Sequence, residues 1–174
     1  MRRAILLLIL IVLLSIAATA CGPSPKTQAT EFAERLPERV GLFRLDDRAT
    51  IELTAEAVGN TGHITRKYEL PNVAQVYIVI DVYGTGAAAN VAWARRQRDL
   101  QLLGAVFTSD NQLRYKAYPA AQVADLPGGR LAILRNDKVV IEVQYLPAEA
   151  GTAIPDASWT PFLQAVRDAG ESLR

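Results

Sequence analysis

Alternating apolar and polar residues predict the most regular strand of the chain at residues 75–83. One face of this strand would carry Val76, Ile78, Ile80 and Val82, and the other Tyr77, Val79, Asp81 and Tyr83. A strand whose second face carries tyrosines and a carboxylate is typical of an antiparallel sheet that is covered on one side and partly open on the other.

The same two-residue period predicts further strands, and turn residues separate them. The strands are expected at residues 64–70, 106–107, 113–118, 131–135 and 139–145. The turns are expected at Pro71-Asn72, Ser109-Asp110-Asn111, Leu126-Pro127-Gly128-Gly129 and Asn136-Asp137.

The last hairpin has two possible registers. A loop with an odd number of residues, which includes Lys138, places Leu131 and Ile133 on the face of Val139 and Ile141. A two-residue loop places Ala132 and Leu134 there instead. Both registers bury an apolar face.

Three segments have helical patterns. Thr30 would cap a short helix that Pro37 ends, Thr85 would cap a helix that runs to Leu103 before Gly104, and Thr160-Pro161 would begin a terminal helix. Residues 147–158 form a long loop between the last strand and that helix.

Residues 50–58 fit both a strand and a helix. Ile51, Leu53, Ala55 and Ala57 alternate, whereas Leu53, Ala57 and Val58 fit a helical face. We expect a short helix because Ala and Glu favour it.

The element order then predicts an α+β fold with a mostly antiparallel sheet and helices packed mainly on one face.

The N-terminal region has the pattern of a secretion signal. Arg2 and Arg3 precede an apolar run, and Ala18-Thr19-Ala20 leads into the single cysteine, Cys21. This segment resembles the signal of a bacterial lipoprotein, in which these four residues would be the lipobox read by signal peptidase II. The alternatives are an ordinary cleaved signal and a retained anchor, but the apolar run is slightly short for a span of about 20 residues.

The resemblance implies that residues 1–20 are removed and that Cys21 carries the lipid. Residues 21–29, rich in Pro, Ser and Thr, would be a flexible tether, and residues 30–174 one domain. The domain would lie on the extracytoplasmic side of the cell membrane or the outer membrane. No disulfide can then form, and the net charge of the mature chain is about −1.

Several kinds of chemistry have little support in the sequence. The nearly neutral charge argues against nucleic-acid binding, and a single histidine argues against common metal sites, so no cofactor is expected. Gly84-Thr85-Gly86-Ala87-Ala88-Ala89 matches a dinucleotide fingerprint, but we interpret it as a strand-to-helix turn. His63 could serve an envelope hydrolase with a serine and a carboxylate, although no motif supports this.

The candidate binding residues are Arg96, Asp81, Tyr77 and Tyr83. Arg96 interrupts an apolar stripe of Ala89, Trp93, Leu100 and Leu103, so its guanidinium needs a partner. Its stem would pack while the guanidinium reaches solvent or a carboxylate such as Asp81 or Glu142, or the guanidinium would hold an anionic ligand or lipid headgroup. If Arg96 only pairs, Arg96→Met should cost little and removal of the carboxylate should cost more.

The tyrosines indicate a possible interface. Tyr77, Tyr83 and either Tyr68 or Tyr115 could line the second sheet face, either as a protein interface or as ordinary cross-strand packing. We therefore expect a non-enzymatic accessory domain that binds another envelope component. A small-ligand or lipid-binding protein with Arg96 in its pocket is the alternative, and a pocket of roughly 300 Å³ or more would favour it.

Overall fold

The structure of the protein is a computed structural model, and it describes residues 22–46, 51–53, 62–109, 118 and 120–171. Within these residues one antiparallel sheet has the strand order β1-β2-β4-β5-β9-β8-β7-β6, and β3 also pairs with β4. The strands are β1 (Arg39–Val40), β2 (Phe43–Leu45), β3 (Ile51–Leu53), β4 (Gly62–Leu70), β5 (Ala74–Val82), β6 (Val106–Ser109), β7 (Ala120–Leu126), β8 (Gly129–Asn136) and β9 (Val139–Pro147). The predicted α+β class with an antiparallel sheet is confirmed.

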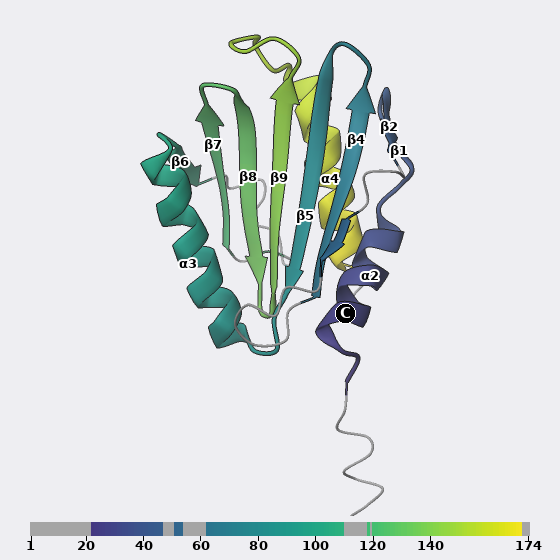
Figure 1. Ribbon diagram of the computed structural model, residues 1–174, viewed down its shortest axis with the longest axis vertical. Coiled ribbons are helices and arrows are strands. Elements are labelled where there is room, and N and C mark those ends of the chain that lie inside the picture. The colour runs from purple at the N-terminus through teal and green to yellow at the C-terminus, as the bar shows by residue number, and fades with distance from the viewer. Residues whose placement is uncertain (1–21, 47–50, 54–61, 110–117, 119, 172–174) are drawn as a thin grey trace, which may run out of the picture.

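The helices lie on both faces of this sheet. They are α2 (Pro25–Arg35), α3 (Gly86–Leu102) and α4 (Asp156–Glu171). Helices α2 and α4 pack in one core with the buried side chains of β4, β5, β8 and β9, whereas α3 packs on the opposite face against β8 and β9 (Figure 1). The predicted placement of the helices mainly on one face is therefore not confirmed, because α3 lies on the face opposite α2 and α4.

The larger core is organised around Phe162 of α4. Its ring makes edge-to-face contacts with Phe43 at 5.1 Å and with Tyr68 at 5.4 Å between ring centroids. Such contacts add to the stabilisation that comes from burying the rings. Phe162 thus joins α4 to β2 and β4.

Helix α2 begins earlier than the sequence predicted. Ser24 is the N-cap, its hydroxyl accepts a hydrogen bond from the backbone N–H of Thr27, and Pro25 is the first helical residue. Ala29 and Phe32 are buried against the sheet. The prediction of a flexible tether through residue 29 is therefore wrong from Pro25 onward, because packing stabilises a segment that composition alone assigns to coil.

Helix α3 has the predicted ends. Thr85 caps it by accepting a hydrogen bond from the N–H of Ala88, and Gly104 follows the helix with a φ of +92°. The predicted apolar stripe is correct for Ala89 and Leu100, which are buried. It is wrong for Leu103, the C-cap residue that follows the helix, which is 68% exposed.

The structure differs from the sequence predictions at three places among the other strands. Residues 51–53 form β3 rather than a helix, because β4 pairs with them, and residues 54–58 lie outside the described residues. The expected strand at 113–118 also lies outside them, except for Tyr118, which is not in a strand. Strand β7 was missed, because its alanine-rich sequence has low strand propensity and pairing with β6 and β8 defines it.

The β8–β9 hairpin has the two-residue loop. Asn136 pairs with Val139, so that Asp137 and Lys138 form the turn, and Leu134 pairs with Ile141. Ala132 and Leu134 therefore share the face of Ile141 and Val143. This register buries them under α2 and α4 and turns Leu131 and Ile133 toward α3.

Helix α4 begins at Asp156, one turn before the predicted cap. Pro161 lies inside the helix rather than at its first residue, and Thr160 is not the cap. The extra turn carries Trp159, which is buried in the larger core. Burial of this indole offsets the weak helical preference of the residues around it.

Candidate interaction face

Part of the sheet face on the α3 side is not covered by any described helix. Helix α3 packs mainly on β8 and β9, and β5 and β4 lie farther across the sheet from this helix (Figure 1). We call this region the open face. Its residues are all partly exposed: His63, Thr65, Lys67, Glu69, Gln75, Tyr77, Val79, Asp81 and Gln144.

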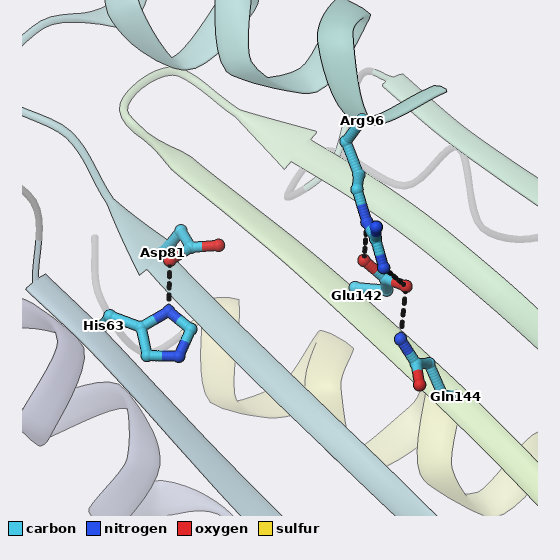
Figure 2. Close-up of polar contacts among 5 residues, drawn as sticks. All are labelled: His63, Asp81, Arg96, Glu142 and Gln144. Atoms are coloured by element: carbon cyan, nitrogen blue, oxygen red, sulfur yellow. Dashed lines mark hydrogen bonds and ion pairs between the residues drawn. The ribbon is translucent and has the colours of Figure 1, made fainter. Parts of the chain in front are cut away.

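His63 and Asp81 form the closest polar pair on the open face. They are direct cross-strand partners on β4 and β5, and His63 Nδ1 lies 2.6 Å from Asp81 Oδ1 (Figure 2). This hydrogen bond raises the pKa of His63 above its usual value of 6.5, and partial burial opposes the shift. The protonated imidazole is thus the form that the pair stabilises.

Further along the face, polar groups pair within the sheet. Lys67 Nζ donates to Asp46 Oδ2 at 3.3 Å and to Glu69 Oε2 at 3.5 Å. The Tyr77 hydroxyl donates to Gln75 Oε1 at 2.9 Å. The charges of the open face therefore have partners in the protein, and the tyrosine ring is held in one orientation.

Arg96 of α3 lies between the helix and the open face. Its Nε and Nη2 donate to Glu142 Oε2 and Oε1 at 2.6 and 2.8 Å, and Gln144 Nε2 donates to the same Oε1 at 2.5 Å (Figure 2). The hydrogen bonds to Glu142 raise the pKa of Arg96, and burial opposes the shift. The expected carboxylate partner is therefore Glu142, and Asp81 pairs with His63 instead.

The structure separates the predicted tyrosines. Tyr77 and Asp81 lie on the open face, whereas Tyr83 packs beside Val140 and Trp93 next to α3, where burial raises its pKa to about 12. Tyr68 is on the opposite face and fully buried, so the prediction that it lines the second face is wrong. Tyr115 and Cys21 lie outside the described residues.

Asp81, His63 and Thr65 lie in a row like the acid, base and nucleophile of a catalytic triad, but their surroundings do not form an active site. The Thr65 hydroxyl oxygen lies 3.4 Å from His63 Nε2. Thr65 is in the middle of β4 and pairs with Ile51 on one side and Val79 on the other. Its backbone N–H is therefore enclosed by the sheet and cannot stabilise an oxyanion. The geometry gives the hydrolase hypothesis no further support.

The glycine-rich segment has a packing role. Strand β5 has antiparallel neighbours on both sides, so this segment is not part of a parallel βαβ unit. A Cβ atom on Gly86 would lie 2.5 Å from Asp137 Oδ1. The glycine therefore allows α3 to start close to the β8–β9 turn.

Two clefts lie at opposite ends of the sheet. One, of about 290 Å³, is lined by residues that include Pro23, Phe32, Lys138 and Val139. The other, of about 270 Å³, lies at the β4–β5 turn beside Leu146. Arg96 lines neither cleft, so the prediction that it lies in a ligand pocket has no support in these two.

Neither a membrane span nor a metal cluster is found among the described residues. No described helix is both long and apolar enough to cross a bilayer. In the same part of the chain, no three His, Cys, Asp or Glu residues are grouped so that they could hold a metal ion.

Thr65, Lys67, Gln75 and Gln144 were not identified from the sequence as part of a site. The period-two pattern of residues 64–70 did place Thr65 and Lys67 on the face opposite Ile64 and Tyr68. Gln144 lies two residues after Glu142, which the same period places beside it. Strand alternation was thus the signal that could have found these residues.

Comparison with solved structures gives only weak similarity. No protein-family model matches the chain, and no curated protein sequence matches it. The extracellular domain of PknH from Mycobacterium tuberculosis is similar over 64% of this chain and 64% of that domain, with 11% identity and a TM-score of 0.38. The chain thus matches less than two thirds of the length of that domain, and so low a score supports no inference about function.

Proposed function

We propose that this protein is a non-enzymatic interaction domain of the cell envelope, held at a membrane by lipid on Cys21, which binds a protein partner through the open face. The observation that carries the proposal is the combination of an uncovered sheet face with Tyr77 and with polar side chains that are already paired. Interfaces are enriched in tyrosine and need few unpaired charges.

The paired charges favour a protein partner over an anion. Lys67 and His63 already contact carboxylates, and Arg96 is bound to Glu142 at two points. An anion would have to displace these carboxylates, whereas a protein surface can cover the pairs and hydrogen-bond to their outer edges. Tyr77 supplies an amphipathic ring whose orientation the Gln75 contact restricts, which reduces the entropy lost on binding.

The proposal can be tested by photo-crosslinking in cells that make the full lipoprotein. A photoreactive phenylalanine analogue replaces Tyr77, and in a matched control it replaces Glu34, which is exposed on α2. We expect an adduct of one defined mass at position 77, absent at position 34 and weakened by Gln144→Lys. Equal labelling at both positions, or none at position 77, would contradict the proposal.

The small-ligand or lipid-binding alternative has one observation in its favour. The 290 Å³ cleft is close to the lower limit for ligand pockets, and Pro23, two residues after the expected lipid site, lines it. If this alternative is correct, palmitate should raise the melting temperature, and Val139→Trp should remove that shift by filling the cleft. The open-face proposal expects no shift.

A further inference from the structure

One row of exposed side chains runs obliquely across the outer side of α3. Its members are spaced four residues apart: Val91, Arg95 and Asp99 lie on α3, and Leu103 is the C-cap residue that follows it. Residues four apart form a ridge on a helix surface. Val91 and Leu103, at the two ends of the ridge, are each 68% exposed. Figure 1 shows α3 at the outside of the domain with no described element beyond it.

The two charged side chains of this ridge are exposed and form no ion pair or hydrogen bond within the described part of the chain, although Asp99 lies close enough to Arg96 to help raise its pKa. Arg95 and Asp99 are one helical turn apart, yet no hydrogen bond or ion pair joins them to each other or to another described side chain. Their neighbour Arg96 is bound to Glu142 instead. The ridge therefore offers one exposed cation and one exposed carboxylate, neither in an ion pair, between two exposed apolar side chains.

The order of these residues is self-complementary. Read from one end the ridge is apolar, positive, negative and apolar; read from the other it has the same pattern with the charges exchanged. A two-fold axis through the middle of the ridge would place Val91 against Leu103 of a second copy and Arg95 against Asp99 of that copy. An isologous interface requires this kind of match.

We propose that α3 is the contact surface for a second copy of this chain, with the two α3 helices antiparallel. Ridges with four-residue spacing pack at about −50°, the commonest class of helix contact. Leu102 and Val106, which are 81% and 77% exposed, add apolar surface at each end of the contact. A partner of a single charge sign would leave one member of the Arg95 and Asp99 pair unmatched. This proposal does not depend on the function of the open face.

Charge exchange provides the first test. The full chain is solubilised in a mild detergent, and its dimer dissociation constant is measured by sedimentation equilibrium. Arg95→Asp and Asp99→Arg should each weaken the dimer by about tenfold or more, since each brings like charges together twice across the axis. The double variant Arg95→Asp/Asp99→Arg restores the complementarity and should recover dimerisation. A monomeric native chain, or single variants that dimerise as well as the native chain, would overturn the proposal.

Cysteine crosslinking in cells provides the second test. In the double variant Val91→Cys/Leu103→Cys, a short bismaleimide should link two copies. The two positions are about 18 Å apart along one helix, so they cannot link to each other within one copy. The single variants Val91→Cys and Leu103→Cys and the native chain, which contains only Cys21, should give no dimer through α3. Linkage in the single variants would indicate a parallel contact, and no linkage in the double variant would indicate no contact; both results contradict the proposal.

Discussion

Arg96 on α3 and Glu142 on β9 form a two-point ion pair in which the carboxylate is much the more buried partner. The Glu142 side chain is 8% exposed, whereas that of Arg96 is 40% exposed. The pair joins the helix to the sheet, and the two side chains would respond differently to the loss of their partner.

Because of this difference, we expect loss of Arg96 to destabilise the protein more than loss of the Glu142 charge, which is the reverse of the order expected from the sequence alone. Arg96→Met leaves a nearly buried carboxylate with only Gln144 as a described side-chain partner, and we expect a loss of about 3 kcal/mol in the free energy of unfolding. Glu142→Gln should cost less, because Arg96 can turn to solvent. The double variant Arg96→Met/Glu142→Leu should recover most of the loss. Urea unfolding of the three variants measures the order, and a larger cost for Glu142→Gln would contradict it.

The His63–Asp81 pair predicts that stability depends on pH. The folded pKa of His63 is raised, so its contribution is fully present below the unfolded pKa near 6.5 and is lost as the pH rises through the folded pKa. The free energy of unfolding should therefore fall across this interval, with a slope of at most about 1.4 kcal/mol per pH unit for one proton. His63 is the only histidine, so His63→Gln should remove this slope. Urea unfolding at several pH values measures the slope. A slope that persists in His63→Gln would mean that a group other than His63 causes it.

Phe162 should be among the most sensitive positions of the larger core. Its ring is fully buried and contacts both Phe43 and Tyr68. We expect Phe162→Ala to lower the free energy of unfolding by about 3–5 kcal/mol, since it leaves a cavity among three elements. Gln164→Ala, an exposed substitution on the same helix, should change it by less than about 0.5 kcal/mol. Thermal melting of the two variants measures the contrast.

Cys21 remains a prediction from the sequence signal. If it carries the lipid, the protein should partition into a detergent phase, and Cys21→Ser should move it to the soluble fraction or leave the precursor uncleaved. Mass spectrometry of the purified protein should find an acylated N-terminal cysteine. An unmodified N-terminus that begins after Cys21 would disprove lipidation.

Local signals in the sequence determined β4, β5 and α3. The alternation of residues 75–83 gave the central strand and its two faces, and Thr85 and Gly104 gave both ends of α3. These features were predictable because they depend on neighbours within a few residues. The need of Arg96 for a carboxylate was predictable for the same reason, since its place in an apolar stripe follows from helical periodicity.

Tertiary structure decided the features that depend on distant partners. Strand β7 exists because β6 and β8 pair with its alanines, and α2 and α4 begin a turn or more early because Ala29 and Trp159 are buried by packing on the sheet. The sheet register places His63 opposite Asp81, so these two side chains pair, and Arg96 pairs with Glu142. Burial and hydrogen bonding across the sheet outweigh local propensities of a few tenths of a kcal/mol per residue, and these contacts are fixed only when the strands have paired.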